Sequence, residues 1–184
     1  MLILRKCEIV SLLHEVREWL ILKKKQADIL YDYMIDSPQA LTRDDTFEQL
    51  RDLKNDYASI IVNASDLNDE YIAGFFDAEG CVTVQKTSGA YIAIGQSGNH
   101  SILEAIRSYF GSNAKRYKGL LNIWGDDGVR VAERIIPYSI VKKSQLEALL
   151  KIRKFAHIHY SRRTPEMVTE IETLKQFIKS AKHV

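Results

Sequence analysis

The residues best suited to do chemistry are two acids, Asp77 and Glu79, close to the end of the stretch Tyr71–Gly80. This stretch has residues at the helical spacing i, i+3, i+4, i+7, namely Ile72, Phe75, Phe76 and Glu79. Gly80 is predicted to end the helix, because glycine enters the left-handed conformation without a Cβ penalty. Both acids then lie in the last turn, where the helix dipole already favours Lys or Arg. A bound cation would reverse this unfavourable interaction.

A cation held at these acids would be bound by carboxylate oxygens. Oxygen ligands favour a hard ion, so Mg²⁺ or another hard divalent cation is expected. The sequence shows no Cys/His spacing typical of a zinc site. Its two cysteines, Cys7 and Cys81, lie in unrelated contexts, which indicates reduced thiols and an intracellular protein. No apolar run reaches transmembrane length, and Met1–Leu4 is too short for a signal peptide.

The stretch resembles the LAGLIDADG motif of the homing endonucleases. Five positions match by identity, namely Ala73, Gly74, Asp77, Ala78 and Gly80. Three apolar residues replace apolar ones, and Glu79 is an acid for an acid. The resemblance implies that two such helices pack together through Ala73, Gly74, Asp77 and Ala78. It also implies a divalent metal at Glu79 and Gly80, at the base of a DNA groove. Without the resemblance, the stretch reads as a short amphipathic helix that ends in an exposed acidic turn.

After Gly80 the period changes to two. Residues 81–86 and 91–94 alternate around a turn at 87–89, and residues 114–124 read as a second hairpin. Between the hairpins, Asn99 is predicted to cap a helix that Gly111 closes. Residues 125–128 read as a loop, and helices are expected over 129–136, over 144–158 and after Thr164-Pro165. The order over 67–158 looks like an αββαββα LAGLIDADG core. We therefore predict an α+β fold with a curved antiparallel sheet, preceded by a helical segment.

The predicted hairpins form a ribbon that could enter the major groove of DNA. The side chains expected to face the DNA are Thr83, Gln85, Lys86, Tyr91, Lys115, Arg116, Tyr117, Lys118, Asn122 and Trp124. The excess of basic residues lies in the part of the chain that contains the hairpins, which favours DNA binding there. Residues 1–64 carry 9 basic and 11 acidic residues (net −2), and the rest of the chain carries 17 and 13 (net +4). The alternative is that basic residues on exposed strands only block edge-to-edge pairing.

The chain contains an internal repeat. Residues 18–30 share with residues 137–149 an aromatic residue, two aliphatics, a Lys-Lys pair and a Gln at the start of a helix. By resemblance to the family, Lys142 is the active-site lysine that polarises solvent or offsets phosphate charge. The alternative is a solvated lysine pair at a helix start. Residues 8–35 read as helical with an interruption at 23–26. The predicted domains are therefore a helical segment over 1–64, similar to the end of a first LAGLIDADG domain plus linker, and a complete domain over 65–184.

The resemblance implies a site-specific, Mg²⁺-dependent endonuclease acting on double-stranded DNA in intron or intein mobility. One motif supplies one acid and two strands need two, so a homodimer is expected, with Asp77 receiving N–H bonds from the partner helix. Glu79 is one methylene longer than aspartate. Family members often place a polar residue in the second strand to orient water, where this chain has Ala93 or Gly95. The alternative function is a weak or inactive DNA- or RNA-binding relative, similar to an intron maturase that binds intron RNA. The third hypothesis is a structural domain that binds no nucleic acid.

Overall fold

The computed structural model describes residues 5–36, 41–85 and 89–181. The chain forms two compact units, Met1–Val62 and Asn63–Val184, which are described separately here. Lys86, one of the residues expected to face DNA, lies outside the described residues. In the described part of the chain, no helix is both long and apolar enough to cross a membrane.

The first unit consists of helices among its described residues. These are α1 (Lys6–Val16), α2 (Lys24–Met34) and α3 (Arg43–Asn55), with 3-10 turns at Arg17–Trp19 and Asp56–Ser59. The prediction that residues 23–26 interrupt the helical stretch is wrong, because α2 begins at Lys24 and the break comes before it. Thr42 caps α3, and its hydroxyl accepts the Asp45 N–H at 3.3 Å. Neither α1 nor α2 has a large buried side chain.

The second unit begins with α4 (Asp69–Glu79), β1 (Gly80–Val84) and β2 (Ala90–Gly95). It continues with α5 (Ser101–Tyr109), β3 (Lys115–Tyr117), β4 (Leu120–Ile123) and α6 (Gly125–Ile135). Two helices follow, α7 (Lys143–Lys154) and α8 (Pro165–Ser180), and 3-10 turns lie at Ala64–Asp66 and Tyr160–Arg162. The predicted α+β class and the αββαββα order are confirmed.

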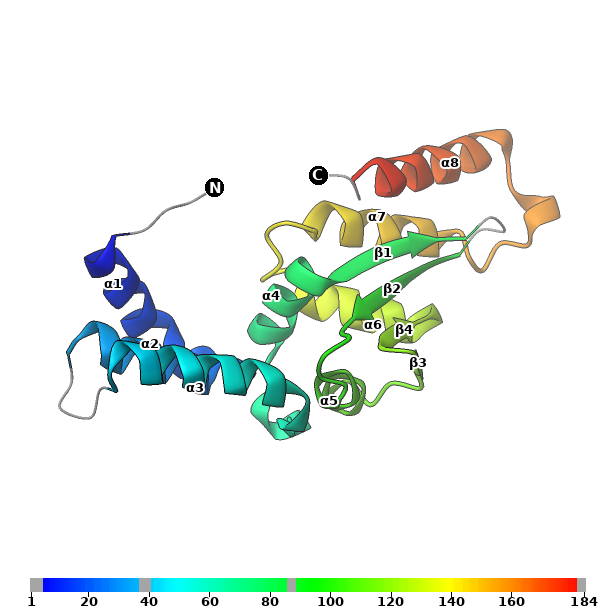
Figure 1. The fold of residues 1–184 in the computed structure, drawn as a ribbon. Coiled ribbons are helices and arrows are strands. Elements are labelled where there is room, and N and C mark those ends of the chain that lie inside the picture. Colours follow the sequence, from blue (N-terminus) through cyan, green and yellow to red (C-terminus); the bar gives the residue numbers. More distant parts are fainter. Residues whose placement is uncertain (1–4, 37–40, 86–88, 182–184) are drawn as a thin grey trace. The chain divides into compact units, whose positions relative to one another are not determined.

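The four strands form one antiparallel sheet with the order β1-β2-β4-β3. Alternate side chains point to opposite faces of a sheet, and here one set is fully buried: Val82, Ile92, Ile94, Leu121 and Ile123. Helices α4, α6 and α7 pack on the strands at this buried face, and α8 packs against α7 and β1 (Figure 1). Among the described residues, no helix covers the other face of the sheet, which we call the open face.

In the second unit, asparagine side chains cap the starts of two helices, α4 and α5. The Asn68 side chain accepts the Tyr71 N–H at 2.7 Å, and Asn99 accepts the N–H groups of Ser101 and Ile102 at 3.0 and 3.3 Å. Gly111 has a φ of +55°, as predicted for the residue that closes α5. The predicted loop at 125–128 is wrong, because these residues form the first turn of α6. Acids at the N-terminus of a helix are favourable, and this stretch has two.

Candidate functional site

The end of α4 presents one acid to solvent. Glu79 is the last residue of the helix and is exposed, and within the described part of the chain no hydrogen bond or ion pair occupies its carboxylate. Gly80 follows with φ −92° and ψ 166°, so the prediction of a left-handed helix stop is wrong. Glycine is needed here for space. A Cβ would overlap the Phe76 ring and lie 2.7 Å from the Phe76 carbonyl oxygen.

The carboxylate of Asp77 binds the loop between α6 and α7. It accepts hydrogen bonds from the Ser139 hydroxyl (2.6 Å) and from the N–H groups of Ile140 (2.6 Å), Val141 (3.0 Å) and Lys142 (3.0 Å). Burial alone would raise the pKa of Asp77, but these four bonds outweigh it and hold the pKa below its ordinary value. All four donors belong to the same chain, whereas we expected N–H groups of a partner helix.

Lys142 lies at the C-terminus of α4. Its ammonium donates to the carbonyl oxygens of Asp77 (2.6 Å), Phe76 (3.2 Å) and Ala78 (3.5 Å). A helix end leaves such carbonyls without partners, and a cation there interacts favourably with the dipole. Lys142 therefore supplies the positive charge that the last turn of α4 lacks in its own sequence. We call Asp77, Lys142 and the loop residues 139–141 the clasp of α4.

The four residues expected at a helix–helix interface do not share one surface. Gly74 and Ala78 are exposed, and a Cβ on Gly74 would have no atom within 4 Å. Ala73 is fully buried in the core of its own unit, so its predicted place in the interface is wrong. Asp77 is half-buried and bound in the clasp. Beside Asp77, the loop residues Ile140 and Val141 expose 88% and 70% of their surface, which places an apolar patch next to this end of α4.

The open face of the sheet gathers several of the residues predicted to face DNA. Tyr91 pairs with Thr83 across β1 and β2, and its ring stacks on Trp124 with a centroid distance of 3.6 Å. In the next row, Asn122 pairs with Ala93 on one side and Lys115 on the other. The second strand has no polar side chain at Ala93, but Asn122 of β4 places one directly beside it. Cys81 pairs with Ala93 in the same row and was not predicted to lie there.

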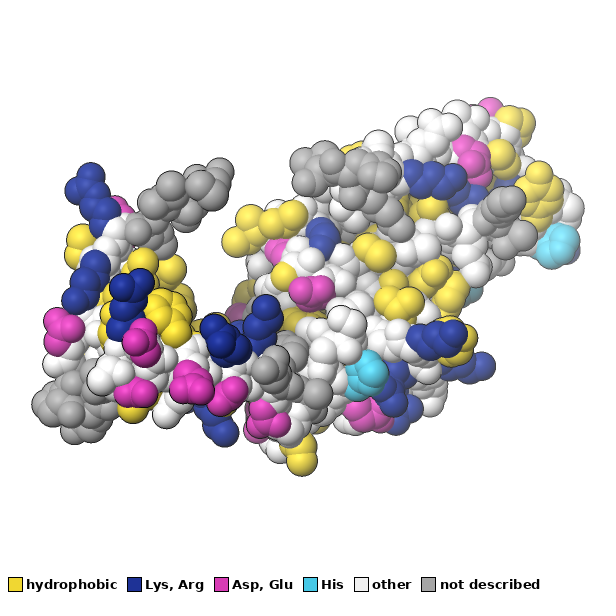
Figure 2. All heavy atoms as spheres, viewed as in Figure 1, with side chains coloured by type: hydrophobic (Ala, Val, Ile, Leu, Met, Phe, Trp, Pro, Cys, Tyr) yellow, Lys and Arg dark blue, Asp and Glu magenta, His cyan; other side chains and the backbone are white. Residues whose placement is uncertain are grey.

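The rest of the predicted set lies at the edge of the sheet. Lys115 and Tyr117 are exposed on β3, and Gln85 is exposed after β1. Arg116 pairs with Leu121, whose side chain is buried, so Arg116 points away from the open face and its prediction as a residue of that face is wrong. Lys118 lies in the turn to β4 with a φ of +44°. Lys and Arg side chains gather at the β3–β4 end of the sheet (Figure 2).

The residues missed by sequence reasoning are those of the clasp loop. Ser139, Ile140 and Val141 meet Asp77 although they lie 62 to 64 positions away in the chain. The signal that could have found them is the repeat itself, because it marks the residues just before Lys142 as a unit. Nothing in local periodicity relates this loop to α4.

The donor atoms near Glu79 fit a hard ion only in part. Within the described ranges, no group of three or more His, Cys, Asp or Glu side chains could hold a metal. Mg²⁺ is commonly bound by one or two carboxylates together with substrate phosphates and water. A site at Glu79 and Gly80 therefore needs oxygen ligands from another molecule, such as a phosphodiester.

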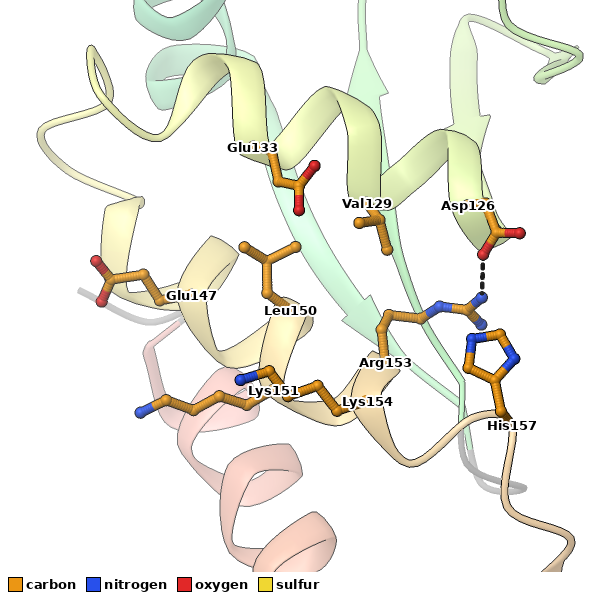
Figure 3. Close-up of a pocket in the computed structure, with 9 residues that line it drawn as sticks. All are labelled: Asp126, Val129, Glu133, Glu147, Leu150, Lys151, Arg153, Lys154 and His157. Carbon is orange, nitrogen blue, oxygen red and sulfur yellow. Dashed lines mark hydrogen bonds and ion pairs between the residues drawn. The ribbon is translucent and has the colours of Figure 1, made fainter.

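A separate groove of about 580 Å³ lies between α6 and α7 (Figure 3). Val129 and Leu150 form its floor, and charged side chains surround them, among them Arg153, which binds Asp126 at 3.0 Å. In Figure 3 the strands lie behind both helices. The groove is therefore on the outer side of α6 and α7, away from the open face of the sheet.

Among known proteins, only solved structures are similar to this chain. No protein-family model matches the sequence, and no curated protein is similar to it. The homing endonuclease I-CvuI, solved in complex with its target in the presence of Ca, is similar at 23% identity over 61% of this chain and 80% of that one, with a TM-score of 0.49. I-CvuI with an I-CreI target and Mg, with the DNA not cleaved, gives 22% identity over the same shares and a TM-score of 0.48. A double mutant of I-SmaMI gives 15% identity over 95% of this chain and 67% of that one, with a TM-score of 0.49. The solved structures similar to this chain thus include homing endonucleases, the family that the sequence resembles.

Proposed function

We propose that this protein is a divalent-metal-dependent endonuclease that cuts double-stranded DNA at specific sites and acts as a homodimer through α4. The observation that carries the proposal is the position of Glu79. It is an exposed acid without a hydrogen-bond or ion-pair partner among the described residues, at the point where the motif helix α4 enters the open sheet.

Glu79 and Gly80 are proposed to hold the metal together with phosphate oxygens of the DNA. When bound, the metal supplies charge stabilisation at the scissile phosphate and lowers the pKa of a bound water. The role of Lys142 is to offset negative charge at this end of the helix, where it lies 2.6 Å from the Asp77 carbonyl oxygen. Asp77 fixes the backbone around Lys142 and so holds the last turn of α4 in place.

The open face of the sheet is proposed to bind DNA. Lys115 and Lys118 would contact phosphates, which gives affinity that falls with salt. Thr83 and Asn122 offer hydrogen-bonding groups to base edges, and the Tyr91–Trp124 stack offers apolar contact. Phosphate contacts position a protein on DNA, and contacts to base edges read its sequence.

The second acid is proposed to come from a second copy of the chain. Gly74 and Ala78 are small, exposed and one turn apart, so another helix could approach α4 closely there. The neighbouring Ile140 and Val141 would be covered in such a contact. A second candidate function is a DNA- or RNA-binding relative with weak or no cleavage, of the intron maturase kind. Two observations favour it: the single acid, and the apolar Ala93 in the middle row of the open face.

The test is cleavage of a double-stranded DNA library with Mg²⁺ by the native chain and by two variants. Glu79→Gln should reduce cleavage by about 100-fold or more, because it removes a charge at the metal. Glu133→Gln, which changes another exposed acid, on α6, is the matched control and should cut normally. Equal cleavage by Glu79→Gln would refute the role of this residue. Salt-dependent DNA or RNA binding without cleavage would favour the second candidate. Sedimentation with and without DNA tests the homodimer.

A further inference from the structure

The register of the sheet arranges the side chains of the open face in rows that run across the strands. Three rows alternate with the buried ones, and from the α4 end outward they hold Gly95, Leu120 and Tyr117, then Cys81, Ala93, Asn122 and Lys115, then Thr83 and Tyr91 with Trp124 stacked on Tyr91. The two central strands, β2 and β4, supply the middle of every row.

The middle of the open face is apolar. The outward residues of β2 offer aromatic, methyl or bare backbone surface, and Leu120 and Trp124 at the two ends of β4 are 43% and 40% exposed. A Cβ on Gly95 would lie 3.4 Å from the Leu120 side chain, so Leu120 lies beside β2. On these two described strands, Asn122 is the only outward residue with a side-chain amide or charge. Exposed apolar surface of this kind marks a binding site.

The edge of this apolar surface is basic. Residues 115–124 contain three Lys or Arg residues and no Asp or Glu. Lys115 ends the middle row, and the Lys118 ammonium lies 5.3 Å from the centroid of the Tyr117 ring. Hydrophobic side chains lie over the strands, with Lys and Arg at the β3–β4 end (Figure 2). Charge complementarity therefore favours a polyanion with apolar groups between its charges, which is the character of a DNA groove.

Base pairs differ in how well they suit an apolar surface. In the major groove, the thymine C5-methyl is the apolar group, whereas G·C pairs offer hydrogen-bonding groups and no methyl. Such groups would lose water against β2 and β4 without gaining a partner, which is unfavourable. An asparagine amide pairs with N6 and N7 of adenine. Asn122 lies directly opposite Ala93, so a group for adenine and a surface for a methyl are side by side.

We infer that the open face selects A·T pairs by contact with thymine methyl groups. Leu120, Ala93 and Trp124 cover the methyls, and Asn122 binds adenine. This inference rests on the proposed DNA binding and adds which bases are bound. It also separates DNA from RNA, because RNA carries uracil, which lacks the methyl, and its deep, narrow major groove is closed to side chains.

The test compares duplexes that differ in the methyl alone. The native full-length chain is titrated in EDTA, which separates binding from cleavage, with alternating poly(dA-dT) and poly(dA-dU). Both duplexes present the same acceptors in the minor groove. We expect poly(dA-dT) to bind tighter by about 4-fold for each methyl covered, and about 10-fold or more in all. Replacing cytosine by 5-methylcytosine in poly(dG-dC) adds a methyl and should tighten binding to that duplex.

The variants are judged by the ratio of the poly(dA-dT) and poly(dA-dU) affinities, which we call the methyl ratio. Leu120→Gln should lower this ratio by about 4-fold, since it replaces apolar surface at one methyl. Phe177→Gln changes an apolar residue of α8 that is 41% exposed, and this matched control should leave the ratio unchanged. Cys81→Ser is nearly isosteric and makes the same kind of change in the middle row, which keeps the test decisive if Leu120→Gln does not fold.

The outcomes distinguish this inference from the proposed function. Equal affinity for the thymine and uracil duplexes would overturn the selection by methyl groups and leave the DNA binding intact. Absence of binding to every duplex at low salt would refute the proposed function as well. A methyl ratio that stays unchanged in both folded variants would overturn the assignment to the open face. Tighter binding to RNA than to poly(dA-dT) would also overturn it, in favour of the second candidate function.

Discussion

The clasp of α4 predicts that Asp77→Asn destabilises the second unit in a pH-dependent way. The carboxylate accepts four hydrogen bonds of 2.6 to 3.0 Å. A hydrogen bond to a charged group contributes roughly 1.5–3 kcal/mol, but bonds that share one acceptor do not add, and asparagine keeps one oxygen. We therefore expect a loss of about 2–3 kcal/mol in the free energy of unfolding near neutral pH.

The sign of the pH dependence follows from the lowered pKa of Asp77 in the folded state. A lowered pKa stabilises the fold above the unfolded pKa of about 3.9, and this stabilisation is lost as the pH falls through the folded pKa. Asparagine does not titrate. The difference between the native chain and Asp77→Asn should therefore be constant from about pH 7 to about pH 5 and should shrink below about pH 4.

Urea unfolding followed by tryptophan fluorescence measures this difference. Trp19→Phe in both proteins leaves Trp124, which belongs to the second unit, as the single tryptophan. Asp126→Asn is the matched control, because Asp126 is 89% exposed in its ion pair with Arg153 and should change stability by less than about 1 kcal/mol. A difference between native and Asp77→Asn that stays the same down to about pH 3, or that is no larger than the control, would refute the reasoning.

Two further predictions concern α4 and the open face. Gly80→Ala should lower the free energy of unfolding by about 1–3 kcal/mol, because its Cβ would overlap Phe76. Gly74→Ala should raise the free energy of unfolding by up to about 1 kcal/mol, because alanine favours a helix and its Cβ would meet no atom within 4 Å. Thermal unfolding measures both changes. The opposite order would contradict the steric account of Gly80. Lys115→Ala should weaken DNA binding alike for all sequences and reduce the slope of log affinity against log salt by about 1, as measured by titrations at several salt concentrations. An unchanged slope would show that Lys115 does not contact phosphate.

The elements of the second unit follow from local sequence. Helical spacing in α4, alternation in β1 and β2, and the cap at Asn99 are all short-range signals, and each was predicted correctly. The second hairpin over residues 114–124 was predicted for the same reason. These features are set by residues within a few positions of one another, so a single sequence contains the information needed.

The errors come from contacts between distant residues or from the register of short segments. Arg116 was placed on the open face because a strand of three residues shows too little alternation to fix its register. Ala73 was placed in an interface because a small residue suits both a core and a helix contact. For Gly80, sequence cannot tell a need for positive φ from a need for space. The partners of Asp77 were missed because they lie more than 60 positions away.

The clasp has a consequence for the order of events during synthesis. Asp77 leaves the ribosome 62 residues before its first partner, Ser139. At typical translation rates of about 5–20 residues per second, α4 therefore exists for roughly 3–12 s before the loop that fixes its end has been made. During this interval its last turn lacks Lys142 and carries two acids. The local conformation around Glu79 thus becomes fixed only after all four strands of the sheet have been translated.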